Sequence, residues 1–190
     1  IMVLESQRLS RLIEEILDLA RLESGRLTMK PVAVNLTKLA KQSSDAIFRL
    51  HEENGIGFEF YAADAPAIVI ADPDRLEQVI INLLENARKF ANPQHPKIKL
   101  SVYPIDNAFQ LSVEDNGPGI PPTERENVFE KFYQLQLKEH TSMQGRPKGS
   151  GLGLPISRAI IHHLGGKLWA AESQLGGTKM TLELPAVSAM

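Results

Sequence analysis

The sequence contains no cysteine, which excludes disulfide bonds and thiolate metal sites and fits a reducing compartment. No run of residues approaches the roughly 18 apolar positions of a membrane-spanning helix, and no signal peptide precedes the first element. Neither sign of charge dominates, because the net charge is −2 and basic residues alternate with acidic ones. This balance argues against a nucleic-acid partner. We therefore expect a cytoplasmic chain without direct membrane contact, whether or not it belongs to a membrane-anchored bacterial sensor.

The first 25 residues carry apolar side chains at steps of three and four, which predicts a helix ending near Ser24-Gly25. A lone helix of this length is marginal in water, so its wide apolar stripe needs a partner. Two arrangements are open: the helix folds back onto the domain, or it belongs to an intermolecular helical bundle. We prefer the bundle, because about ten polar residues (25–35) separate this helix from the next element. The pattern begins abruptly at Ile1, as expected for a piece of a longer protein.

The remaining 155 residues alternate between helical and strand patterns. We predict helices over about 36–53, 73–90 and 154–164, the second with Asp72 as its N-cap and Pro73 in its first turn. The predicted strands cover about 57–62, 67–70, 97–103, 108–114, 167–172 and 179–184. This order indicates an α+β two-layer sandwich, with a mixed and mainly antiparallel sheet of about five strands covered by about three helices.

The segment "RLEQVIINLLENARKF" is the most informative helix. At about 100° per residue, one stripe of this helix is apolar, and a second stripe carries Asn82, Asn86, Lys89 and Phe90. The two asparagines either cap loops and face water, or they form one side of a ligand site. In the second case an amide oxygen can join the oxygen shell of Mg²⁺, with phosphates as further ligands, and Lys89 can reach the same phosphates.

Two glycine-rich segments are ambiguous by themselves. "DNGPGI" after the predicted strand is either an ordinary turn or a place where backbone approaches a flat ligand while Asp115 binds its edge. "KGSGLGLPIS" is either a flexible linker or a helix start that binds phosphate through backbone N–H groups. Neither G-x-x-x-x-G-K-[ST] nor a G-x-G-x-x-G that opens a strand–helix unit occurs in the sequence.

Taken in order, the segments "NLLENARKF", "DNGPGI", "FEKFYQ", "GSGLGL" and "GGT" resemble the N box, first Gly box, F box, second Gly box and third Gly box of the catalytic ATP-binding domain of sensor histidine kinases. That family belongs to the ATPase superfamily shared with gyrase and Hsp90. The resemblance covers about residues 36–185, and "LSRLIEEILDLARLESG" is similar to the end of the second dimerisation helix. It implies a dimerisation-helix segment at 1–25, a linker at 26–35 and a catalytic domain at 36–190, with a lid at about 133–150.

The resemblance also implies ATP and Mg²⁺ as ligands and assigns roles to residues. Asp115 accepts a hydrogen bond from the adenine amino group, and Gly117 and Gly119 let the chain pass close to the base. Asn86 ligates Mg²⁺ with help from Asn82, and Lys89 binds phosphate. Thr178 supports Asp115, and Phe129 anchors the lid together with Phe132. Further nucleotide contacts are implied at Phe90, Ile120, Phe132, Lys148, Gly149, Ser150, Gly151, Leu152, Gly153 and Leu154.

Two departures from the family pattern matter. Phe90 stands where the family usually has Tyr, so the hydroxyl contact of that residue is lost. The phosphoacceptor box H-E-x-x-[ST]-P is absent, since His51 begins "HEENGI", which lacks the Ser/Thr-Pro, and the other four histidines lack a suitable context. We expect the acceptor to lie upstream. The expected partners are a second copy, bound through the N-terminal helix, and the receiver domain of a response regulator.

Two other functions remain as alternatives. A hydrolytic ATPase clamp of the gyrase or Hsp90 type uses a glutamate base one turn before the Mg²⁺-binding asparagine, and that position is Asn82 here, which cannot act as a base. A non-catalytic relative would use the nucleotide or the helix for signalling only. The five intact boxes favour the kinase.

Overall fold

The computed structural model describes residues 13, 15–21, 24, 28–48, 55–135 and 150–187. Its main sheet has five strands in the order β2-β4-β5-β7-β6. Neighbouring strands pair antiparallel except β2 with β4, which are parallel. The strands are β2 (Gly57–Ala62), β4 (Lys97–Ile105), β5 (Ala108–Asp115), β6 (Lys167–Glu172) and β7 (Thr178–Pro185). The predicted α+β fold class, with a mixed and mainly antiparallel sheet, is confirmed.

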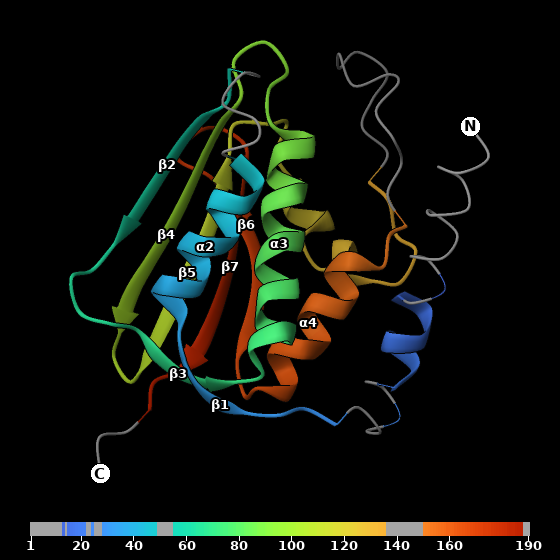
Figure 1. Cartoon of the computed structure of the whole chain (residues 1–190). Helices are drawn as coiled ribbons and strands as arrows, with labels where there is room; N and C mark the ends of the chain where they lie inside the picture. The colour runs from blue at the N-terminus through green and yellow to red at the C-terminus, as the bar shows by residue number, and fades with distance from the viewer. Residues whose placement is uncertain are drawn as a thin grey trace.

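Three helices cover one face of this sheet: α2 (Leu36–Phe48), α3 (Pro73–Phe90) and α4 (Gly153–His163). Figure 1 shows α3 in the middle of the helical layer, with α2 and α4 on its two sides. The apolar stripe expected for α3 is the part that faces the core. Its buried members are Leu76, Val79, Ile80, Leu83, Leu84 and Ala87. Burial of this stripe fixes the rotation of α3 and therefore the direction of its polar stripe.

A second, two-stranded sheet lies outside the prediction. Strand β1 (Val32–Asn35) pairs antiparallel with β3 (Ile68–Ala71), although residues 32–35 were expected to end a linker. Val34 is buried opposite Val69. The prediction treated residues 25–35 as a polar linker, although Val32-Ala33-Val34 is a short apolar run. Its pairing partner lies more than 30 residues away, so the run alone did not indicate a strand. Helix α2 ends at Phe48 among the described residues, and the predicted extension to 53 lies outside them.

The start of α3 is fixed by Asp72. Its Oδ1 accepts hydrogen bonds from the backbone N–H groups of Asp74 and Arg75, at 3.1 and 3.2 Å. Its Oδ2 accepts from the backbone N–H of Lys30 at 2.8 Å. The bond from Lys30, followed by those from the helix, holds the pKa of the Asp72 carboxyl below its ordinary value. This side chain therefore caps α3 and ties the chain before β1 to it.

Residues 15–21 of the N-terminal segment are helical and contact the domain. The carboxylate of Asp18 forms a bidentate ion pair with the guanidinium of Arg75, with N–O distances of 2.5 and 3.2 Å. Leu19 is buried in the core. Ile13, Ile16 and Leu17 stay about half exposed. One side of this helix thus packs on the domain while another side remains open. No described helix is long and apolar enough to span a membrane.

We predict that Asp72→Ala lowers the free energy of unfolding at neutral pH by about 1–2 kcal/mol, because the N-cap is lost. The folded-state pKa of Asp72 is depressed, so its contribution is present above the unfolded-state pKa and is lost as the pH falls through the folded-state value. The difference between variant and parent should shrink below about pH 4. Urea unfolding at several pH values measures it. The exposed Asp64→Ala serves as the control, and an equal loss at low and neutral pH would contradict the prediction.

Candidate functional site

The carboxylate of Asp115 lies at the end of β5, where it is only 4% exposed. Its Oδ1 accepts hydrogen bonds from the backbone N–H of Gly117 at 2.8 Å and of Thr178 at 3.2 Å. Its Oδ2 receives no hydrogen bond from the described residues and is not sealed from solvent. Burial raises the pKa of Asp115, and the two N–H bonds oppose that rise. One oxygen is therefore held by the protein, and the other remains able to accept a hydrogen bond from a ligand.

Backbone atoms of three segments pack closely around the Asp115 carboxylate, at positions where only glycine fits. A Cβ on Gly117 would lie 2.2 Å from the carbonyl oxygen of Phe90, at the end of α3. A Cβ on Gly177 would lie 2.4 Å from Asp115 Oδ1. Gly119 has a φ of +74°, which glycine adopts without strain. These glycines bring the end of α3, the turn after β5 and the turn before β7 into contact around one carboxylate.

Asn116 is a structural residue of this region that sequence reasoning missed. Its Oδ1 accepts from the backbone N–H groups of Asn92 and Lys97, at 3.2 and 2.9 Å. Its Nδ2 donates to the carbonyl of His95 at 2.7 Å. The Asp-Asn-Gly pattern indicates a local turn, but the partners of Asn116 lie about 20 residues upstream. The side chain fixes the connection between α3 and β4 beside Asp115.

The polar stripe of α3 borders the same region. Asn82, Asn86 and Lys89 are half-buried, and Phe90 is exposed at the edge. The Lys89 ammonium lies over the ring of Phe90, with Nζ 4.9 Å from the ring centroid. The Asn86 amide makes no hydrogen bond to another described residue. Asn86 is thus the amide of the stripe that can still take a ligand through its oxygen.

The other asparagine is already engaged. Asn82 Nδ2 donates to Ser157 Oγ in α4 at 2.9 Å. A Cβ on Gly153, the first residue of α4, would lie 2.3 Å from Asn82 Oδ1. Asn82 therefore joins α3 to α4 through its amide nitrogen, while its Oδ1 lies against Gly153 and accepts no hydrogen bond from a described residue. Its predicted role beside a metal stays a prediction. The sequence did not predict a role for Ser157, because its hydrogen-bond partner Asn82 lies 75 residues earlier in the chain.

The glycine-rich start of α4 presents mainly backbone. Leu152 is fully buried, and its N–H donates to Ser150 Oγ at 3.1 Å, so the leucine side chain belongs to the core. Leu154 packs against the core as well. Leu152, the N-cap of α4, makes no side-chain bond to the first turn, so among the described residues backbone donors remain there for an anion. Lys148 and Gly149 lie outside the described residues.

The segment expected to anchor the lid is held by one phenylalanine. Phe129 is buried, with the guanidinium of Arg158 4.8 Å from its ring centroid. Phe132 is 62% exposed, so its ring is not the predicted anchor in this structure. Its backbone N–H instead donates to the carbonyl of Gly151 at 3.0 Å. This bond fixes the two ends of the segment 133–150 next to each other.

Two further contacts support the chain between the boxes. Ile120 packs against the core, and its carbonyl accepts from Arg125 Nε at 3.3 Å. The hydroxyl of Tyr133 donates to Glu124. This bond raises the pKa of Tyr133 and lowers that of Glu124.

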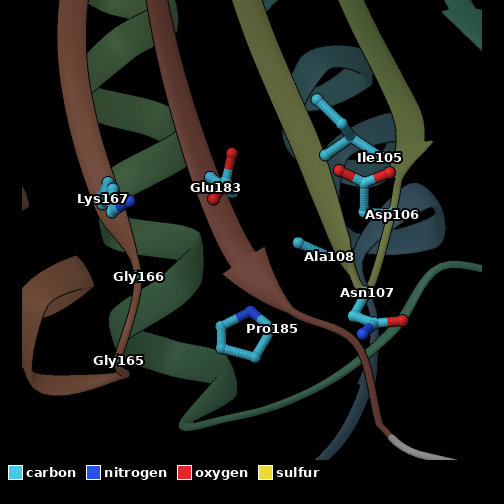
Figure 2. A pocket seen from close by; sticks show the side chains of 9 residues that line it. All are labelled: Ile105, Asp106, Asn107, Ala108, Gly165, Gly166, Lys167, Glu183 and Pro185. Carbon is cyan, nitrogen blue, oxygen red and sulfur yellow. The ribbon is translucent and has the colours of Figure 1, made fainter.

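A depression of about 300 Å³ lies elsewhere on the molecule and is not this site. Figure 2 shows it between the β4–β5 turn, the Gly165-Gly166 turn and the end of β7. It is at the Ala108 end of β5, whereas Asp115 is at the other end, roughly 20 Å away along the strand. Its charged side chains are Asp106, Lys167 and Glu183.

Within the described ranges, no three His, Asp or Glu side chains are grouped to hold a metal ion. A metal would therefore depend on amide oxygen, water and ligand phosphate.

Comparison with known proteins agrees with this arrangement. Residues 71–188 match the family described as histidine kinase-, DNA gyrase B- and HSP90-like ATPases. The circadian input-output histidine kinase CikA of Synechococcus elongatus is 33% identical over 185 residues, which cover 94% of this chain and 23% of CikA. The chain spans from 11% to 46% of the length of eight such curated relatives.

Solved structures give the same result. Full-length ShkA in complex with AMPPNP is 27% identical, with a TM-score of 0.79 over 95% of this chain and 36% of that one. The histidine kinase ThkA in complex with the response regulator TrrA is 26% identical, with a TM-score of 0.74 over 97% of this chain and 49% of that one. The family match covers Asp115, the polar stripe of α3 and the start of α4. The chain therefore belongs to the histidine kinase-, DNA gyrase B- and HSP90-like ATPase family.

Proposed function

We propose that this chain is the ATP-binding kinase core of a sensor histidine kinase, which transfers the γ-phosphoryl group of ATP to a histidine on an upstream dimerisation helix. The observation that carries the proposal is the carboxylate of Asp115, which is buried among glycines with one oxygen held and one oxygen open. A buried acceptor of this kind suits the amino group of adenine. The glycines let the backbone of three segments pack tightly around this carboxylate, which fixes the oxygen that Gly117 and Thr178 bind.

The phosphate end of the site would lie along α3 and α4. The amide of Asn86, which makes no hydrogen bond to another described residue, suits a Mg²⁺ ligand, and bound Mg²⁺ would neutralise negative charge on the phosphates. The uncapped first turn of α4 supplies backbone N–H groups for phosphate oxygens. Lys89 carries a positive charge on the same stripe of α3 as Asn86. The hydrogen bond from Asn82 to Ser157 fixes the distance between α3, which carries Asn86 and Lys89, and α4.

A hydrolytic clamp is less well supported by these contacts. Its general base would occupy the position of Asn82, whose amide nitrogen already donates to Ser157. The nearest carboxylate in sequence, Glu85, is paired with Arg88 at 2.6 Å. Neither residue is placed to activate water. Phosphoryl transfer by positioning and charge stabilisation needs no such base on α3.

The proposed partners follow from the N-terminal helix and from the relatives. Ile13, Ile16 and Leu17 present half-exposed apolar side chains, which suit a homodimeric helical bundle with a second copy. A response-regulator receiver domain would take the phosphoryl group from the acceptor histidine, as the complex of ThkA with TrrA suggests. His51 and His140 lie outside the described residues. We place the kinase core in the cytoplasm.

Asp115→Asn should weaken ATP binding about 10- to 100-fold, as expected for loss of a hydrogen bond to a charged group. An amide nitrogen in place of Oδ2 would also face the adenine amino group donor to donor. Isothermal titration calorimetry measures the change. The exposed Asp106→Asn, at the other end of the sheet, is the control. Unchanged affinity in Asp115→Asn would reject the adenine assignment.

The same variant separates binding from stability. The folded-state pKa of Asp115 is raised, so the stability that this group contributes is greatest below its unfolded-state pKa and is lost as the pH rises through the folded-state value. Asp115→Asn without ligand should therefore unfold at a temperature equal to or above that of the parent at neutral pH. The advantage should disappear below about pH 4. Thermal unfolding followed by circular dichroism across this pH range checks it.

Asn86→Ala should remove the part of ATP affinity that depends on Mg²⁺ and leave binding in EDTA nearly unchanged, because its proposed ligand is the metal. Calorimetry with and without Mg²⁺ gives both values. Gln42→Ala, an exposed amide on α2, controls for loss of an amide from a helix. If affinity falls equally in both conditions, Asn86 contacts the nucleotide directly and the metal assignment is wrong.

A further inference from the structure

Strand β5 ends in two adjacent carboxylates that point to opposite faces of the sheet. Leu111, Val113 and Asp115 alternate on the face covered by the helices, so Glu114 lies on the other face. Figure 1 shows α2, α3 and α4 on one side of the sheet only. Glu114 is nevertheless just 3% exposed. A carboxylate buried to this degree, on a face that no described helix covers, is costly unless hydrogen bonds and opposite charges offset the loss of water.

The contacts of Glu114 show what offsets that cost. Its Oε2 accepts from Ser173 Oγ at 3.0 Å and from the backbone N–H of Gln174 at 3.2 Å. Its Oε1 lies 3.8 Å from Lys99 Nζ and 3.9 Å from Lys179 Nζ. The two lysines flank Glu114 in register, Lys99 on β4 and Lys179 on β7. The lysines balance the charge, and the hydrogen bonds reach only the turn between β6 and β7.

That turn is the one that closes over Asp115. Within it, the Ser173 N–H donates to the carbonyl of Gly177, and the Leu175 N–H donates to Ser173 Oγ, both at 3.0 Å. The turn then delivers Gly177 against Asp115 and the N–H of Thr178 onto Asp115 Oδ1. Glu114 thus holds the first end of the turn, and Asp115 holds the last.

We propose that Glu114 is a positioning residue that sets the orientation of the Asp115 carboxylate, and with it the preference of the site for adenine over guanine. The inference rests on the proposed role of Asp115. If the turn moves, Asp115 Oδ1 loses the Thr178 N–H and the direction of Oδ2 is no longer fixed. Guanine carries a carbonyl oxygen where adenine carries an amino group, so a well-directed carboxylate repels guanine and accepts from adenine. The preference depends on that direction.

A neighbouring residue pair on the same face of the sheet shows that a charged side chain is not needed for packing there. Ser112 and Thr181 form the next pair on the same face, two positions along β5 and β7, and are both buried. Their hydroxyls bond to each other at 3.1 Å, without any charge. A neutral pair therefore suffices to complete this face where no turn has to be held.

The test compares ATP and GTP affinities by calorimetry in the 190-residue chain. Glu114→Ala should weaken ATP about five- to tenfold and reduce the ratio of GTP to ATP dissociation constants by a similar factor. Glu114→Gln keeps an acceptor for Ser173 and Gln174, so its ratio should stay within about twofold of the parent. Glu183→Ala is the matched control, since Glu183 lies on the same face and accepts from Gln110 at 3.1 Å, away from the turn.

A changed ratio in Glu114→Ala, restored in Glu114→Gln, supports the inference, because a loss of stability alone leaves the ratio unchanged. An unchanged ratio in folded Glu114→Ala overturns it. If Glu114→Ala fails to fold, Ser173→Ala removes the bond from Ser173 Oγ to Glu114, together with the bond that Ser173 Oγ accepts from the Leu175 N–H, and should lower the ratio about two- to fivefold. An unchanged ratio there also overturns it. Should Asp115→Asn weaken ATP while these variants bind normally, the inference alone fails and the adenine site stands.

Discussion

The site depends on one buried carboxylate that three separate parts of the chain surround. Asp115 Oδ1 takes the N–H of Gly117 from the turn after β5 and the N–H of Thr178 from the start of β7. The carbonyl of Phe90, at the end of α3, lies so close to Gly117 that no side chain fits between them. A shift in any of these segments would change the direction of the free oxygen. The fold is therefore tightly constrained where the base is proposed to bind.

Helix α3 serves both the core and the site. Its buried leucines and isoleucine pack on the sheet and set its rotation, and that rotation points Asn82, Asn86 and Lys89 along the edge toward α4. The two asparagines look equivalent in the sequence, but α4 distinguishes them. The amide nitrogen of Asn82 donates to Ser157 and its oxygen packs against Gly153, whereas the Asn86 amide makes no hydrogen bond to another described residue.

Sequence reasoning succeeded where the cause is local. The bounds of α3 follow from Asp72-Pro73 and from a 3.6-residue period, and the β4–β5 hairpin follows from Asp106-Asn107 between two strand patterns. It failed where the partner is distant. Strand β1 depends on β3, and Asn116 depends on the chain after α3. The bond between Glu114 and Ser173 joins residues 59 positions apart, so nothing near Glu114 indicates it. The ring of Phe132 was predicted to anchor the segment, but the ring is exposed, and it is the backbone N–H of Phe132 that bonds to Gly151.

The two ends of the site differ in how far the protein alone determines them. At the proposed base end, hydrogen bonds and glycine contacts fix Asp115, Gly117 and Gly177 without a ligand. At the proposed phosphate end, the Asn86 amide makes no hydrogen bond to another described residue, and the N-cap of α4 makes no side-chain bond to its first turn. Preorganised groups lose little entropy on binding and can discriminate between bases, whereas open donors and acceptors adapt to a ligand and a metal. The hydrogen bond from the Phe132 N–H to the Gly151 carbonyl brings the residues that flank segment 133–150 together, just before the start of α4.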